Sequence, residues 1–164
     1  KMFRYEIIWE KERPTNIFFM KKQIGKVHEN VLVFYSKQPV YNPQLEKSME
    51  PENNKHKVIN NTSKTHKKQK YVFTEGYNNK VRYPRSIQKI NRDRFGALHP
   101  TQKPVALFEY LIKTYTNEWD TVLDNCAGSG TTGIAARNTN RNYILIEKDE
   151  SYCNIIRNRL SPSL

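Results

Sequence analysis

The chain has 164 residues, which is room for about one domain. Hydrophobic residues make up 37% and aromatic residues 12%, as in folded proteins, and a mean hydropathy of −0.85 with no apolar run near 18 residues argues against a membrane-spanning helix. The two cysteines, Cys126 and Cys153, cannot form a disulfide framework and have no partner at zinc-binding spacing. We therefore expect a cytoplasmic protein with no metal site and no membrane contact.

The net charge of +12 and the pI near 9.7 predict a polyanionic partner, nucleic acid above all. The charge is unevenly distributed. Residues 41–98 hold 13 basic and 5 acidic side chains, whereas residues 99–164 hold 7 of each. The basic excess is therefore concentrated in the middle of the chain.

Two apolar runs near the start, residues 5–9 and 31–35, predict buried strands, and the connection between them is ambiguous. Residues 37–98 are rich in Pro, Asn and Lys and only weakly periodic, which indicates a long loop or a small accessory subdomain. One interpretation is a disordered linker. The other is a segment that faces DNA, since its aromatic residues alternate with cations as base stacking and phosphate contact require. The cations expected to contact double-stranded DNA are Lys67, Lys68, Lys70, Arg82, Arg85, Lys89, Arg92 and Arg94.

The last third of the chain has the sharpest periodicity. Pro104 suits the first turn of a helix whose inward face carries Leu107, Leu111 and Tyr115. A short strand at 121–124, a glycine loop and a helix follow, and then a second strand at 143–147 and a helix that Asp149 can cap. This βαβα order predicts an α/β fold with a parallel sheet.

The glycine loop carries the chemistry. Residues 128–133 read Gly-Ser-Gly-Thr-Thr-Gly directly after a predicted strand, and Glu147 ends the next strand. Glycines let a backbone approach a nucleoside ligand, and a carboxylate at that position accepts hydrogen bonds from ribose hydroxyls. A plain tight turn would also need glycines. A nicotinamide enzyme is disfavoured, because the 31 residues after Gly133 are too few for the remaining strands of a dinucleotide fold.

Together with the run from His99 to Pro104 and the run from Val122 to Thr132, this loop resembles the β-class DNA amino-methyltransferases. The resemblance is strong over 98–160, moderate over 5–36 and absent over 37–97. It implies a Rossmann-like methyltransferase sheet in permuted order, with 1–36 as late-sheet strands, 37–98 as a basic, loop-rich target-recognition insertion, and 99–164 as the cofactor portion.

The resemblance also implies S-adenosylmethionine as the cofactor. Glu147 would hold its ribose, and the segment from His99 to Pro104 would bind its methionine end, with Lys103 and Thr101 facing the carboxylate. Cys126 is expected to be a packing residue and not a nucleophile. The full set of implied cofactor residues is His99, Thr101, Gln102, Lys103, Pro104, Asp124, Asn125, Gly128, Ser129, Gly130, Thr131, Thr132 and Glu147.

One part of the family pattern is missing. The reaction uses an Asp/Asn/Ser-Pro-Pro-aromatic tetrapeptide that binds the target amine of a flipped base, and none of the eight prolines here is adjacent to another. No catalytic residue is therefore assigned. We expect an incomplete sheet. The missing strands would lie between the two cofactor strands, at 121–125 and 143–147, and the early strands at 5–9 and 31–35. An N-terminal part of the same enzyme or a partner subunit would supply them, and a homodimer is also open.

The leading hypothesis is a site-specific DNA methyltransferase of a restriction-modification type that transfers a methyl group to adenine N6. This chain would hold the cofactor-binding and DNA-recognition part, inactive alone. Cytosine N4 as the target, or a catalytically inert DNA-binding remnant, remain alternatives that these motifs do not separate.

Overall fold

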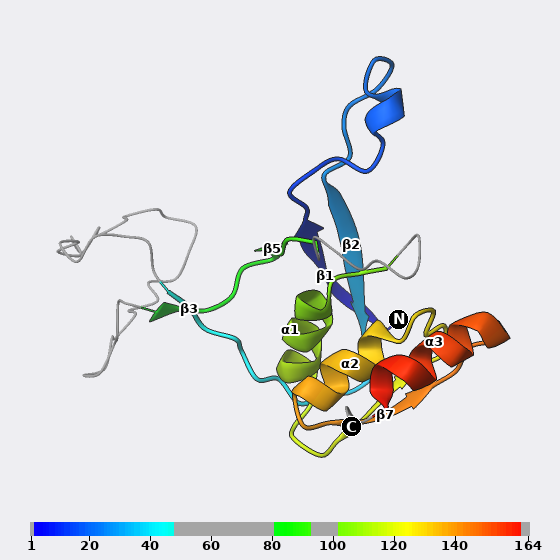
Figure 1. Cartoon of the computed structure of the whole chain (residues 1–164). Helices are drawn as coiled ribbons and strands as arrows, with labels where there is room; N and C mark the ends of the chain where they lie inside the picture. Colours follow the sequence, from blue (N-terminus) through cyan, green and yellow to red (C-terminus); the bar gives the residue numbers. More distant parts are fainter. Residues whose placement is uncertain (1, 48–80, 93–101, 162–164) are drawn as a thin grey trace, which may run out of the picture. The chain divides into compact units, whose positions relative to one another are not determined.

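The computed structural model describes residues 2–47, 81–92 and 102–161 (Figure 1). The chain divides into two compact units: a first unit made of Lys1–Gln44 with Arg85–Leu164, and a second unit, Leu45–Pro84. The elements in chain order are β1 (Phe3–Glu10), the 3-10 helix η1 (Ile17–Phe19), β2 (His28–Phe34), β3 (Glu46–Lys47), β4 (Val81–Arg82), β5 (Ile87–Lys89), α1 (Val105–Tyr115), β6 (Thr121–Asp124), α2 (Thr131–Asn138), β7 (Asn142–Leu145) and α3 (Glu150–Leu160).

The two predicted early strands exist and form one antiparallel hairpin of β1 and β2, with Trp9 opposite Glu29. The expectation that both are buried is wrong for the described residues. Trp9 is buried, but Leu32 and Phe34 are exposed. Side chains of a strand alternate between its two faces, so an apolar run is buried throughout only where both faces are covered. Here one face of β2 lacks a cover among the described residues.

A third strand, β5, pairs in parallel with β1, so that the sheet order is β2-β1-β5. Sequence periodicity missed this strand because it has only three residues. It lies within the predicted insertion 37–98, yet it belongs to the first unit. The second unit contains the antiparallel pair of β3 and β4, where Arg82 Nε donates to Glu46 Oε2 at 3.1 Å.

The predicted βαβα unit is present. Strands β6 and β7 pair in parallel, with Thr121 opposite Asn142, and α2 and α3 follow them. Asp149 is the N-cap of α3, as predicted, and its Oδ1 accepts a hydrogen bond from Ser151 N at 2.8 Å. Its side-chain and backbone hydrogen bonds with Ser151 lower the pKa of Asp149.

Helix α1 packs on α2 and forms the main core. Ile112 is buried there with Ala135 and Ala136. The predicted inward face is only partly right: Leu107 is buried, whereas Leu111 and Tyr115 line a pocket. The helix begins at Val105, and Pro104 is its N-cap in an extended conformation.

Two side-chain contacts fix the direction of α1 against the hairpin. Near the start of β1, the hydroxyls of Tyr5 and Tyr115 are 2.8 Å apart, and burial together with this hydrogen bond raises the pKa of Tyr115. At the other end, Lys103, just before α1, is 3.2 Å from Glu29, which pairs with the end of β1. Helix α1 therefore runs antiparallel to β1.

The strands of β6 and β7 form a sheet of their own, and no described strand pairs with the outer edge of β6. This agrees with the expected division of the sheet. The α-helices of the described residues have at most 11 residues each, which is too short to span a bilayer.

Candidate functional site

The glycine loop connects the end of β6 to the start of α2. Gly128 and Gly130 have φ angles of 52° and 80°, in the left-handed region where side chains with a Cβ are strained. A Cβ on Gly130 would also lie 2.9 Å from Ile156 Cγ1 of α3. The requirement for glycine at 128 and 130 is thus conformational, and the loop is held by its own backbone hydrogen bonds, among them Gly130 N to the Ala127 carbonyl at 2.8 Å.

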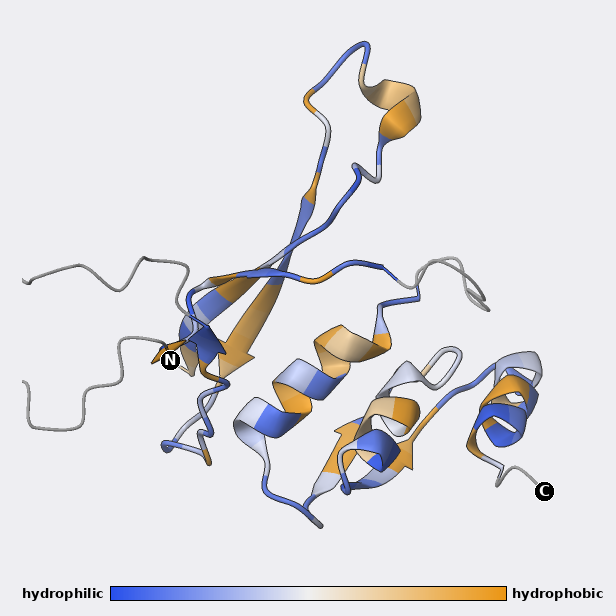
Figure 2. Ribbon diagram, turned by 60° about the vertical axis from the view of Figure 1, so that its left-hand side comes forward, coloured by the Kyte–Doolittle hydropathy of each residue, from blue (hydrophilic) through white to orange (hydrophobic). Residues whose placement is uncertain are grey.

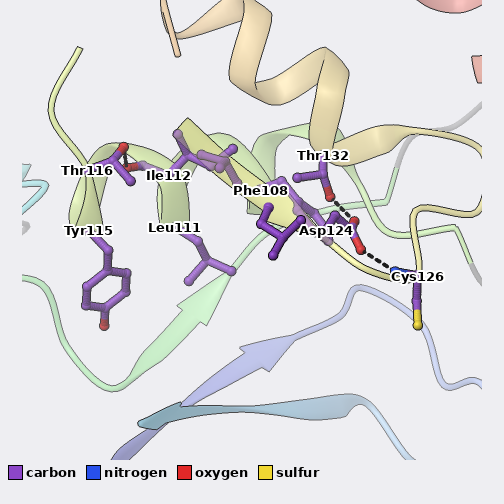
Figure 3. Close-up of a pocket in the computed structure, with 10 residues that line it drawn as sticks. Phe108, Leu111, Ile112, Tyr115, Thr116, Asp124, Cys126 and Thr132 are labelled. Atoms are coloured by element: carbon purple, nitrogen blue, oxygen red, sulfur yellow. Dashed lines mark hydrogen bonds between the residues drawn. The ribbon is translucent and has the colours of Figure 1, made fainter. Parts of the chain in front are cut away.

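Asp124, the last residue of β6, organises this loop from within. Its Oδ1 accepts a hydrogen bond from Cys126 N at 3.0 Å, and its Oδ2 accepts a short one from Thr132 Oγ1 (Figure 3). Asp124 therefore joins the start of the loop to the first turn of α2. Both of its oxygens are engaged in shaping the loop.

Glu147 follows β7 and closes the site from the neighbouring strand. Its Oε2 accepts a hydrogen bond from Gly128 N at 2.8 Å, and its Oε1 accepts from Lys148 N at 2.9 Å and Asp149 N at 3.0 Å. The backbone hydrogen bonds from Asp149 and Gly128 are the largest causes that lower the pKa of Glu147, which keeps it charged. Since a carboxylate has about four acceptor positions, Glu147 can still accept from a ligand.

The hydroxyl side chains of the loop are buried. Ser129, Thr131 and Thr132 all lie inside, and Ser129 Oγ donates to Gln102 Oε1 at 2.9 Å. Arg159 Nη1 of α3 donates to the Ser129 carbonyl at 2.6 Å. Sequence reasoning missed Arg159, because a contact across 30 residues leaves no local pattern.

A pair of lysines shares one carboxylate beside the start of α1. Glu29 Oε2 lies 3.2 Å from Lys103 Nζ, and Glu29 Oε1 lies 3.1 Å from Lys11 Nζ. Burial tends to raise the pKa of Glu29, but the hydrogen bonds from Lys11 and Lys103 lower it overall. Lys103 thus lies beside the site with its charge partly balanced by Glu29. Of the other predicted residues, His99 and Thr101 lie outside the described residues.

A pocket of about 470 Å³ opens beside the outer edge of β6. Cys126 lines this pocket and is exposed. The expectation that Cys126 is a packing residue is therefore wrong for the described residues. Cys126 is exposed because no described strand pairs with the edge of β6 that lies opposite β7. The residues that line the pocket come from α1, β6 and the start of the glycine loop and α2 (Figure 3): Phe108, Leu111, Ile112, Tyr115, Thr116, Val122, Leu123, Asp124, Cys126 and Thr132.

The predicted DNA-binding cations are only partly described. Arg82 pairs with Glu46 in the second unit, and in the first unit Lys89 Nζ is 4.0 Å from Glu10 Oε1. Arg85 and Arg92 are exposed. Lys67, Lys68, Lys70 and Arg94 lie outside the described residues. Among the residues that the structure describes, no group of three His, Cys, Asp or Glu could hold a metal ion.

The glycine loop lies between a strand and a helix, and a carboxylate that follows the parallel neighbouring strand is hydrogen-bonded to it. This arrangement is typical of α/β proteins that bind nucleoside cofactors. The chain matches the N6/N4 DNA methylase family over residues 1–158 and belongs to it. Its fold is accordingly that of the Rossmann-like DNA methyltransferases.

Two similar proteins are both named Type II methyltransferases. The Type II methyltransferase M2.DpnII of Streptococcus pneumoniae is 43% identical over 68 residues, which are 42% of this chain and 25% of that protein. M.HindIII of Haemophilus influenzae is 48% identical over 62 residues, 38% of this chain and 20% of that protein.

Among solved structures, the complex of M1.HpyAVI with SAM has 29% identity and a TM-score of 0.61, and the match covers 98% of this chain and 63% of that chain. The cytosine-N4-specific PvuII DNA methyltransferase has 18% identity and a TM-score of 0.67, over 98% and 52%, which shows the fold alone. The matches thus span a fifth to a quarter of these two curated relatives and under two thirds of these solved chains.

Proposed function

We propose that this chain is the cofactor-binding and DNA-recognition part of a methyltransferase that transfers a methyl group from S-adenosylmethionine to adenine N6 in double-stranded DNA. The observation that carries the proposal is the hydrogen bond from Gly128 N to Glu147 Oε2, which joins the glycine loop to the carboxylate of the next strand. Family membership and a 29% identical relative solved with SAM support it.

The residues present fit the cofactor. Glu147 is charged, half-buried and fixed by three backbone N–H groups, so it can accept hydrogen bonds from a ribose. Lys103 lies before α1, and Gln102 links that segment to Ser129 of the loop. In this arrangement Lys103, with His99 and Thr101, would bind the methionine carboxylate, while Glu29 holds the Lys103 ammonium in place.

The cofactor, when bound, supplies an electrophilic methyl group. The task of this chain is then to orient that group, and positioning two reactants is itself a large part of catalysis. Asp124 and Arg159 fix the loop backbone from its two sides. No nucleophilic side chain would be required, since the amine of the base would take the methyl group directly, while the bond from that methyl group to sulfur breaks and the amine gives up a proton. The groups that bind the target amine would then come from a part of the polypeptide outside these 164 residues.

We further propose that strands from another part of the same polypeptide cover the open edge of β6 and the exposed face of β2. The support is the pocket beside β6 and the exposed apolar residues Leu123 on β6 and Phe34 on β2. An open apolar edge is a template for strand pairing. The chain also spans only 63% of the solved chain of M1.HpyAVI.

Labelled methyl transfer tests the proposed function. The polypeptide that carries this chain is incubated with methyl-labelled S-adenosylmethionine and duplex DNA, and the nucleosides are separated after digestion. We expect label in N6-methyladenine. Label in N4-methylcytosine would correct the target base, and DNA binding without any transfer would favour the inert remnant instead.

A further inference from the structure

The loop between β1 and β2 displays apolar side chains to solvent. We call residues 13–27 the tip loop; it contains η1 and forms the far end of the hairpin (Figure 2). Phe18 is 97% exposed and Ile24 is 92% exposed, and Ile17 and Phe19 beside them are also exposed. Contiguous exposed apolar groups of this kind mark interaction sites.

The tip loop is a closed structure held by its own hydrogen bonds. Asn16 Nδ2 donates to the Ile24 carbonyl at 3.0 Å, and Asn16 Oδ1 accepts from Lys26 N at 2.7 Å. Thr15 N donates to the Lys26 carbonyl at 3.1 Å. Because one asparagine ties both arms together, Phe18 is presented outward on a fixed support.

The charge of the tip loop selects a polyanion. Arg13, Lys21, Lys22 and Lys26 are exposed around the apolar tip, and residues 13–27 contain no acidic side chain. An apolar wedge surrounded by cations is how proteins insert side chains between bases while neutralising the flanking phosphates. A cation-free rim would instead have suited a purely apolar partner.

The tip loop also lies on the same side of the first unit as the glycine loop. Lys11, which follows β1, and Glu29, at the start of β2, mark the end of the hairpin where the tip loop begins. Glu29 contacts Lys103 before α1, and the adjacent Gln102 contacts Ser129 of the glycine loop. A duplex presented to the cofactor side would therefore meet the tip loop.

We propose that the tip loop is a DNA-contacting element separate from the basic insertion, with Phe18 inserted against the bases and Lys21, Lys22 and Lys26 on the phosphates. This inference rests on the proposed DNA substrate. It assigns a role to a segment whose sequence alone was ambiguous.

Salt dependence tests the cations. A fluorescent duplex of mixed sequence is titrated with the protein at several salt concentrations, and the slope of log K against log salt is measured. Lys21→Ala/Lys22→Ala should reduce the magnitude of the slope by about 1.8, since each phosphate contact contributes about 0.9. The matched control is Lys37→Ala/Lys113→Ala. Both lysines are exposed; Lys37 follows the end of β2, and Lys113 lies in the last turn of α1, so both are far along the chain from the tip loop. Equal slopes in both double variants would overturn the proposal.

Affinity at fixed salt tests the wedge. Phe18→Ala should weaken duplex binding about tenfold with an unchanged salt slope, and Phe18→Tyr should retain binding, because stacking needs the ring. Thermal unfolding checks that each variant folds. Unchanged affinity of Phe18→Ala, or a change only in its self-association by sedimentation, would overturn the proposal and assign the tip to a protein interface.

A parallel titration with S-adenosylhomocysteine separates the two proposals. If wild-type protein binds both this ligand and DNA, and the tip variants bind DNA as tightly as wild type, only the proposed role of the tip loop is refuted. Protein that binds neither ligand refutes both. Protein that binds DNA through the tip but not S-adenosylhomocysteine refutes the proposed cofactor site and leaves the tip loop supported.

Discussion

Removing Glu29, the charged partner of the buried Lys11, should destabilise the fold. The Lys11 side chain is 1% exposed, and its Nζ lies 3.1 Å from Glu29 Oε1 and 3.3 Å from Thr15 Oγ1, above the Trp9 ring. A fully buried pair that loses one partner is destabilised by about 3–5 kcal/mol, because an uncompensated charge remains. Glu29 is 31% exposed and water can replace it in part. We therefore expect Glu29→Ala to lower the free energy of unfolding by about 1–3 kcal/mol.

Urea unfolding followed by circular dichroism measures this change. The control is Lys103→Ala, whose side chain is 35% exposed and whose loss should cost under about 1 kcal/mol. The pKa of Glu29 is lowered in the folded state, so its contribution is present above its ordinary pKa of 4.5 and is lost as the pH falls through the folded-state pKa. The gap between wild type and Glu29→Ala should thus narrow below pH 4.5. A gap that stays constant over that range, or a variant as stable as wild type, would show that the ion pair of Glu29 with Lys11 does not stabilise the fold.

Three further changes address the glycine loop and its supports. Gly133→Ala should destabilise by about 1–2 kcal/mol despite better helix propensity, because its Cβ would lie 2.7 Å from a leucine of β7; urea unfolding checks this. Arg159→Gln should increase hydrogen exchange at Ser129 and its neighbours, while Arg157→Gln on the solvent side of α3 should not. Asp149→Ala should lower the melting temperature at neutral pH, and this difference should vanish in acid. The pKa of Asp149 is lowered in the folded state, so its capping contribution is lost when the carboxylate is protonated. A difference in melting temperature that persists at low pH contradicts the capping role of Asp149.

Local patterns predicted the elements whose causes are local. The order strand, glycine loop, helix around Gly128 follows from backbone requirements of single residues, and Asp149 caps α3 through a neighbour two positions away. The position of Glu147 was predictable for the same reason, because a parallel strand must end beside the loop.

Long-range contacts were not predictable. Arg159 reaches Ser129 across 30 residues, and β5 is too short to show a period. The exposure of Leu32 and Cys126 was also missed, because burial depends on which strands cover an edge and not on how apolar a run is. The tip loop was ambiguous in sequence, since its order depends on Asn16 bonding both arms.

Calorimetric titration with S-adenosylhomocysteine tests whether Glu147 and the glycine loop form a methyltransferase cofactor site. Wild type is compared with Glu147→Gln and with Glu150→Gln, a matched change of an exposed glutamate that starts α3. We expect binding by wild type and by Glu150→Gln, binding at least tenfold weaker by Glu147→Gln, and no displacement by NAD. A folded wild type that binds NAD in preference, or equal affinity in all three proteins, would overturn the cofactor assignment.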